Sequence, residues 1–233
     1  MAVTTLETMI ANVRERSDME NTNFVSDAEL TKRINESASE LYDLLVRTNE
    51  DYYTITEEFH VSNGANEFDL TDLESEFYKL RGVDWSPDGG TTWMRVRPYQ
   101  FLERDRYLTP RISSRYAPVR YRIVKKSLIF LPKDSAAGHY RVWFVPTFTA
   151  LEDDADTFDG VNGWDEFITL KTALKCINKE ESDTTALSQE LGAVIDRITA
   201  MSTARDLSEP EKISDTRRHF RGTYSPYDYP EEY

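Results

Sequence analysis

Residues 26–47 read SDAELTKRINESASELYDLLVR and carry the signals of a long amphipathic helix. Ser26 and Glu29 have the spacing of a capping box, in which two side chains satisfy the first free backbone N–H groups of a helix. Val25 and Leu30 stand at the hydrophobic-staple positions on either side of that start. The apolar residues that recur at helical spacing are Leu30, Ile34, Ala38, Leu41 and Leu45. We therefore expect a helix from residue 26 to about residue 49, with one buried face.

Further helices are expected on both sides of this one. Apolar residues at helical spacing predict a short amphipathic helix over residues 4–17 and another helix over residues 164–180. A last helix is expected to start at Ser182 or Asp183, which are good capping residues, and to carry apolar residues from Leu187 to Met201.

The apolar period changes to two in the middle of the chain. Residues 53–61 alternate between apolar and polar side chains, which predicts a half-buried strand, and Asn63-Gly64 marks its turn. The short strands expected next are Phe68–Leu70, Leu80–Trp85 and Trp93–Val96, followed by a brief helix with Pro98 in its first turn and its end near Leu108. The strands expected to form a three-stranded meander are Val119–Val124, Leu128–Leu131 and Tyr140–Val145.

These elements predict an α+β fold. Helices open and close the chain, so we expect residues 1–50 and 160–206 to form one discontinuous helical bundle. Residues 51–159 would be a small antiparallel β-domain inserted into that bundle. Residues 207–233 contain prolines and aromatic residues but no aliphatic run, which predicts an extended C-terminal interaction arm.

The composition excludes several classes of protein. Aromatic residues make up 12% of the 233 residues, which is unlike a disordered polyanion. No apolar run approaches the roughly 18 residues of a membrane span, and the first residues lack the features of a signal peptide, so we expect no membrane contact. Cys176 is the single cysteine, which excludes an internal disulfide and a cysteine-built zinc site.

The charge is distributed unevenly along the chain. The net charge is −14, yet 14 basic and 5 acidic residues lie between Lys79 and Arg141. The rest of the chain then holds 14 of the 28 basic and 37 of the 42 acidic residues. Such an uneven field can orient association with a partner.

No residue pattern points to catalysis or to a cofactor. The histidines belong to no zinc or nucleophile motif, and the glycine-rich nucleotide loops are absent. In the acidic loop 152–160, Asp154 and Asp156 have the first spacing of a calcium loop, but Phe158 stands at the next ligand position. We therefore expect no enzyme activity, no cofactor and no metal ion.

The arginine-rich middle is a candidate interaction surface. Its arginines alternate with tyrosines, as in grooves that bind single-stranded nucleic acid, although a net charge of −14 opposes a phosphate backbone. Arginine is equally favoured at protein interfaces, where its fork binds carboxylates. A solvated surface, a nucleic-acid site and a head-to-tail subunit interface all remain open. The residues expected to form such a subunit interface are Arg104, Arg106, Arg120 and Arg122.

The C-terminal arm alternates cations, aromatic rings and prolines. Proline lowers the ordering cost of an extended peptide, and tyrosine and arginine are common anchors at interfaces. A plain disordered tail is the alternative interpretation. The arm residues expected to contact a partner are Arg217, Arg218, Phe220, Arg221, Tyr224, Tyr227, Tyr229 and Tyr233.

Several segments resemble the head–tail adaptor (connector) proteins of tailed bacteriophages. The segments that carry the resemblance are Asn23–Leu30, Arg33–Ser37, Glu40–Leu44, Phe77–Trp85 and Trp93–Arg104, all in the first half of the chain. Such proteins are structural virion components that form rings, usually dodecameric, beneath the portal. They are built from a helical bundle and often extend a C-terminal arm over portal subunits.

The resemblance implies a role for each part of this chain. Residues 217–233 would be the portal-binding arm, and the β-domain would contact neighbouring subunits or a tail or nozzle protein. Double-stranded DNA would pass through the ring without specific binding, and the protein would assemble in the host cytoplasm and reside at the head–tail junction of the virion. Two alternatives remain: another neck or tail protein that does not touch the portal, and a DNA-binding module built on the arginine-rich middle.

Overall fold

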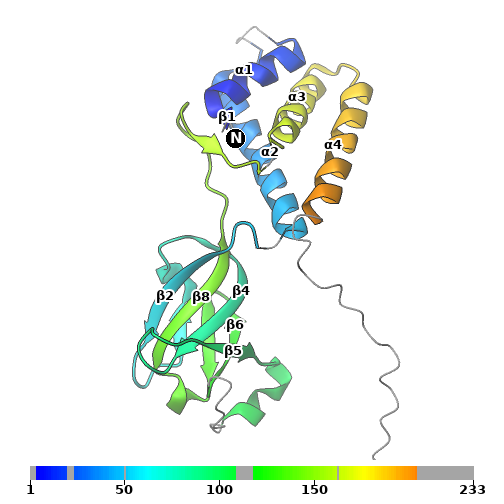
Figure 1. The fold of residues 1–233 in the computed structure, drawn as a ribbon. Helices are drawn as coiled ribbons and strands as arrows, with labels where there is room; N and C mark the ends of the chain where they lie inside the picture. The colour runs from blue at the N-terminus through cyan, green and yellow to red at the C-terminus, as the bar shows by residue number, and fades with distance from the viewer. Residues whose placement is uncertain (1–3, 20–23, 50, 109–117, 162, 204–233) are drawn as a thin grey trace, which may run out of the picture.

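The structure is a computed structural model that describes residues 4–19, 24–49, 51–108, 118–161 and 163–203. It is a mixed α+β structure, as the sequence predicts. Figure 1 shows the helices gathered at one end of the molecule and the larger sheet at the other. The chain passes between the two ends after the second helix and returns after the long strand β8.

The helices in the described ranges pack against one another. Their bounds are α1 (Leu6–Ser17), α2 (Asp27–Thr48), α3 (Glu166–Glu180) and α4 (Thr185–Thr203). α3 contacts each of the other three helices, and α2 also contacts α1 and α4. Their apolar faces share one hydrophobic core, in which Met9, Ile34 and Ile168 are completely buried.

The start of α2 shows how the sequence specifies this packing. The Ser26 hydroxyl accepts a hydrogen bond from the backbone N–H of Glu29 at 3.3 Å, which is the first half of the expected capping box. The Glu29 carboxylate instead accepts hydrogen bonds from Lys179 on α3 at 2.7 Å and from Arg33 at 2.7 Å. The hydrogen bonds from Lys179 and then Arg33 hold the pKa of Glu29 below its usual value. Glu29 therefore links α2 to α3 as well as marking the helix start.

Seven strands of the described chain form one sheet in the order β2-β8-β4-β5-β6-β7-β3. Their bounds are β2 (Ile55–Val61), β3 (Glu67–Asp69), β4 (Phe77–Ser86), β5 (Met94–Pro98), β6 (Arg120–Val124), β7 (Ser127–Leu131) and β8 (Gly138–Pro146). The two edge strands, β2 and β3, lie close to each other. The ring of Phe59 on β2 stacks on the ring of Phe68 on β3, with centroids 3.9 Å apart. The sheet is therefore nearly closed around a core of its own that includes Val83, Phe130 and Tyr140.

The strand pairing corrects two expectations from the sequence. β8 pairs with β2 and β4 and not with β7, so the predicted three-stranded meander is wrong. The sheet is also not purely antiparallel, because β5 and β6 run parallel with Arg97 opposite Arg120. Residues 99–119 separate the two strands, which is long enough for the connection that a parallel pair requires.

Short 3-10 helices lie between strands of the sheet. They are η1 (Leu70–Asp72), η2 (Phe101–Tyr107) and η3 (Lys133–Ser135). η2 lies where the sequence predicts a brief helix, but Pro98 ends β5 and does not begin the helix.

A second, two-stranded sheet joins the N-terminus to the acidic loop. It pairs β1 (Thr4–Thr5) with β9 (Thr157–Phe158), and the backbone N–H of Leu6 donates to the carbonyl of Asp156 at 2.9 Å. Leu151 and Phe158 lie in the helical core, although the sequence places them in the β-rich segment. The helices described are all too short or too polar to cross a membrane.

Candidate interaction surface

The structure brings Arg104, Arg106, Arg120 and Arg122 to one side of the sheet. Arg104 and Arg106 project from η2, and Arg120 and Arg122 lie on β6. The Arg122 Nη1 donates to the carbonyl oxygen of Tyr99 at 3.1 Å, directly before η2. Both elements share one aromatic ring, because the guanidinium carbons of Arg104 and Arg122 lie 4.8 and 5.7 Å from the centroid of Phe101.

The alternation of β6 explains why its arginines face outward. Tyr121, between them, is buried, and successive side chains of a strand point to opposite faces. The Arg120 guanidinium lies over the Tyr107 ring at 5.1 Å from its centroid. Contacts of this kind contribute about 0.5–1 kcal/mol at exposed sites, so they fix η2 against β6 without burying it.

η2 and the residue after it expose apolar side chains among charged ones, of which Arg106 pairs with Glu103 at 2.6 Å. The exposed fractions are 49% for Phe101, 88% for Leu102 and 59% for Leu108. We call Phe101, Leu102, Arg104, Arg106 and Leu108 the η2 knob. Exposed aromatic, aliphatic and arginine side chains that no described element covers are typical of a protein interface.

The sequence did not identify the apolar members of the knob. A 3-10 helix of seven residues offers too few positions for a periodic pattern, so Leu102 and Leu108 gave no signal of a shared surface. The arginines were found because their density is visible in the sequence without any knowledge of the fold.

Other arginines of the middle segment are held within the sheet. The Arg141 guanidinium lies between the rings of Trp93 and Trp143, at 4.5 and 4.9 Å from their centroids. Asp84 accepts hydrogen bonds from Arg141 at 3.1 Å and from the Trp143 indole N–H at 2.7 Å. Arg141 is therefore held within the sheet by Asp84 and two tryptophans. Arg111, Arg115 and the arm residues 217–233 lie outside the described residues.

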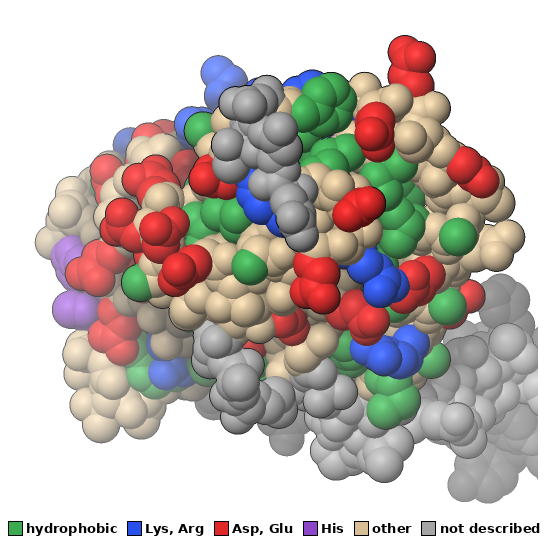
Figure 2. Space-filling view, turned by 90° about the horizontal axis from the view of Figure 1, so that it is seen from above, with side chains coloured by type: hydrophobic (Ala, Val, Ile, Leu, Met, Phe, Trp, Pro, Cys, Tyr) green, Lys and Arg blue, Asp and Glu red, His purple; other side chains and the backbone are tan. Residues whose placement is uncertain are grey.

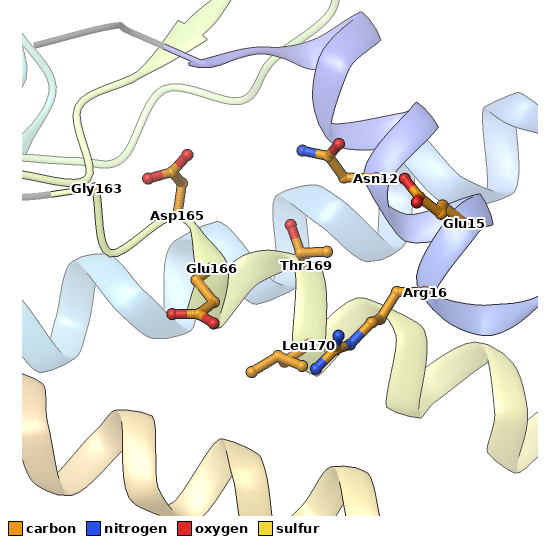
Figure 3. Close-up of a pocket in the computed structure, with 8 residues that line it drawn as sticks. All are labelled: Asn12, Glu15, Arg16, Gly163, Asp165, Glu166, Thr169 and Leu170. Atoms are coloured by element: carbon orange, nitrogen blue, oxygen red, sulfur yellow. The ribbon is translucent and has the colours of Figure 1, made fainter.

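A pocket of about 540 Å³ lies between α1 and the start of α3. Figure 3 shows Asn12, Glu15 and Arg16 on α1 facing Asp165, Glu166 and other residues around the start of α3. Three of its charged groups have partners: Thr4 donates to Asp165, Arg16 pairs with Glu190, and Arg197 lies 3.5 Å from Glu166. The two ion pairs link α1 and α3 to α4, which is a role in helix packing.

The acidic loop acts as a cap. The Asp156 carboxylate accepts hydrogen bonds from the backbone N–H groups of Glu152 at 2.8 Å and Asp153 at 2.9 Å, and these bonds lower its pKa. The backbone N–H of Glu7, in the first turn of α1, donates to the Asp154 carbonyl at 3.2 Å. The loop oxygens thus accept hydrogen bonds from backbone N–H groups of the loop itself and of the start of α1, which is a structural role.

Neither a metal site built from three or more side chains nor a reactive thiol is present in the described part of the chain. No group of three or more His, Cys, Asp or Glu side chains there could hold a metal ion. Cys176 is completely buried on α3, and burial is the main cause that raises its thiol pKa, which disfavours the nucleophilic thiolate.

The comparisons with known proteins identify a family. No curated protein matches the chain. The model of the family described as "SU10 adaptor protein" matches residues 4–213. That range contains every helix and strand of the structure and the η2 knob, and it ends before Arg217 in the expected arm. The chain therefore belongs to the SU10 adaptor protein family and is a phage structural adaptor protein.

Proposed function

We propose that this chain is the subunit of the adaptor ring that joins the phage portal to the tail and forms part of the DNA channel. Membership of the adaptor family supports a structural role in the virion. The observation that carries the proposal furthest is the η2 knob, since an exposed apolar and arginine-rich surface is suited to assembly with other proteins.

Each part of the chain has a separate task in this proposal. Residues 1–50 and 160–206 form the helical bundle that is the scaffold of a dodecameric ring. Residues 51–159 contact neighbouring subunits and the tail or nozzle protein. Residues 207–233 form the arm that binds the portal.

The negative charge of the chain supports passage of DNA without specific binding. Figure 2 shows acidic side chains spread over the face seen from above. A net charge of −14 per subunit repels a phosphate backbone, and the repulsion grows with the number of copies. A polyanionic ring would therefore let double-stranded DNA slide past.

The test is to mix the purified full-length chain with the portal protein of the same viral genome and to weigh the complexes by native mass spectrometry. We expect a portal ring that gains a fixed complement of subunits. A chain truncated after residue 206 should keep the unfolding transition of the full chain and lose portal binding. The matched control is a full-length chain in which residues 217–233 are scrambled, which keeps length and composition.

The outcomes separate the competing proposals. Equal portal binding by the full, truncated and scrambled chains would show that the arm hypothesis is wrong. No association of the full chain with the portal would favour the alternative of another neck or tail protein, which localisation in virions would then identify.

A further inference from the structure

Two histidines face each other across neighbouring strands of the larger sheet. His60 on β2 is the register partner of His139 on β8, and their ring centroids lie 4.8 Å apart with an interplanar angle of 69°. The chain has three histidines, and His219 lies outside the described residues. Both histidines that the structure describes therefore belong to this contact, which we call the histidine pair.

The strand register explains why the histidine pair faces outward. The adjacent register pair, Phe59 and Tyr140, is buried in the core of the sheet. Successive side chains of a strand point to opposite faces, so His60 and His139 point away from that core. Both residues are exposed, and Figure 2 shows their side chains (purple) side by side on the left, next to acidic side chains. The two rings are therefore accessible to a solute.

The spacing of the rings fits two ligands of one metal ion. A histidine nitrogen binds zinc at about 2.0–2.1 Å, which places the centroid of its ring about 3.2 Å from the metal. Two such rings at coordination angles of about 90–110° have centroids about 4.5–5.2 Å apart. The observed 4.8 Å lies inside this range. Edge-to-face packing without a metal allows about 4.5–7 Å, so ring packing is the alternative that an experiment has to separate.

The charges around the histidine pair are compatible with a bound cation. Two residues away on each strand, and therefore on the same face, Glu58 lies opposite Arg141. The Arg141 guanidinium pairs with Asp84 at 3.1 Å, so its positive charge is offset within the sheet. The Glu58 carboxylate then leaves one negative charge. A divalent cation at the pair therefore meets no net positive charge from these neighbours.

We propose that His60 and His139 form a binding site for a divalent transition-metal ion of the zinc, nickel or copper class. Imidazole suits these ions and binds them through a neutral ring nitrogen. No cluster of three or more His, Cys, Asp or Glu ligands exists in the described ranges, so water completes the coordination. The bound ion ties β2, an edge strand of the sheet, to β8, which lies inside it. This site does not depend on the proposed ring.

Isothermal titration calorimetry of the untagged full-length chain with Zn²⁺ or Ni²⁺ tests the site. The variants His60→Gln and His139→Gln each remove one ligand and keep a polar side chain. The matched control is His219→Gln, which removes the histidine outside the pair. The unmodified chain and the control should bind one ion per chain. Each pair variant should bind at least about tenfold more weakly, because the second ligand of a chelate acts at a high effective concentration.

Thermal unfolding and NMR separate a metal site from ring packing. Zn²⁺ should raise the melting temperature of the unmodified chain and of the control but not of the pair variants, because only a ligand of the folded state stabilises it. His139→Phe keeps a ring beside His60, so it should keep the metal-free melting temperature and lose the rise with Zn²⁺. Paramagnetic Ni²⁺ should broaden the imidazole signals of His60 and His139 and leave those of His219 sharp.

Several results would overturn the proposal. They are equal binding by the unmodified chain and both pair variants, or no binding of Zn²⁺ and Ni²⁺ up to about 1 mM, which corresponds to a binding free energy of about −4 kcal/mol. A stoichiometry of one ion per two chains would also overturn it, because the ligands would then come from different copies. Loss of binding in His219→Gln alone would assign the ion to the C-terminal arm. All these measurements use the chain without portal, so their failure leaves the test of the adaptor function unaffected.

Discussion

Tyr42 shows how one side chain connects the helical end of the molecule to the sheet. The residue is 6% exposed on α2, and its hydroxyl donates to the carbonyl of Pro146, the last residue of β8, at 2.7 Å. Burial is the main cause that raises the pKa of Tyr42 to about 12, and the nearby Tyr78 and Asp43 add to it. The folded state therefore strongly favours the neutral phenol.

We expect Tyr42→Phe to lower the free energy of unfolding by about 1 kcal/mol at neutral pH, because it removes one partly buried hydrogen bond. The pKa of Tyr42 in the folded protein lies above the ordinary tyrosine value of 10.0, so the stabilisation by the phenol is present below pH 10 and is lost as pH rises toward 12. The difference in free energy of unfolding between the unmodified chain and Tyr42→Phe should therefore shrink between pH 10 and pH 12. Urea unfolding at pH 7, 10 and 11 measures it, and Tyr107→Phe on half-exposed η2 is the control. A difference that stays constant with pH would contradict the assignment.

At this scale, the sequence predicts which residues are apolar and where charge gathers, but not their partners. The hydroxyl of Tyr42 and its acceptor are 104 positions apart, so no local pattern could pair them. Similarly, the density of arginine indicated an interface at Arg104, whereas its apolar neighbour Leu102 became visible only when the exposure of η2 was known.

At the scale of elements, Gly138 begins β8 in a conformation that side chains rarely adopt. Its φ is +147°, and a Cβ atom there would lie 2.7 Å from the indole nitrogen of Trp85. We expect Gly138→Ala to lower the free energy of unfolding by about 2–4 kcal/mol through steric overlap and backbone strain. Denaturant unfolding monitored by tryptophan fluorescence measures the change.

Gly192 is the matched control for that substitution. It lies inside α4, and a Cβ there would meet no atom within 4 Å. Gly192→Ala should raise the free energy of unfolding by about 0.5–1 kcal/mol, because alanine loses less entropy in a helix. Equal effects at the two glycines would refute the steric argument for β8.

The start of α2 gives a second prediction for an element. Ser26→Ala should lower the free energy of unfolding by about 1 kcal/mol, because the N–H of Glu29 loses its acceptor. Ser26→Gly should cost only about a few tenths of a kcal/mol, since glycine is a fair N-cap residue. Thermal unfolding followed by circular dichroism compares the two, and equal losses would mean that the hydroxyl does not cap the helix.

The elements themselves could be predicted because each is specified by a local period. α2 begins at the expected capping residue, and most strands lie within a few residues of their expected positions. The order of strands could not be predicted in the same way. The parallel pairing of β5 with β6 and the place of β8 between β2 and β4 depend on side chains that are far apart in the chain.

At the scale of the whole molecule, two features decide what the chain can bind. They are its net negative charge and the arginines that already have partners within the chain. Arg122 donates to the Tyr99 carbonyl, Arg120 covers the ring of Tyr107, and Arg141 lies between two tryptophans. These guanidinium groups would have to leave their partners to neutralise phosphates. The excess of 14 negative charges on the chain adds a repulsion that acts on any approaching duplex.

We therefore expect the full-length chain to show no detectable binding to mixed-sequence double-stranded DNA at about 50 mM salt, where phosphate contacts are little screened. Fluorescence anisotropy of a labelled duplex measures this, with a basic DNA-binding protein as the positive control. The contrary result would be an affinity for DNA that falls steeply as salt rises, because each phosphate contact contributes to the salt dependence. That affinity would also be lost in Arg120→Ala. Such binding would make the arginine-rich side a nucleic-acid surface, and the η2 knob could then not be occupied by a neighbouring subunit at the same time.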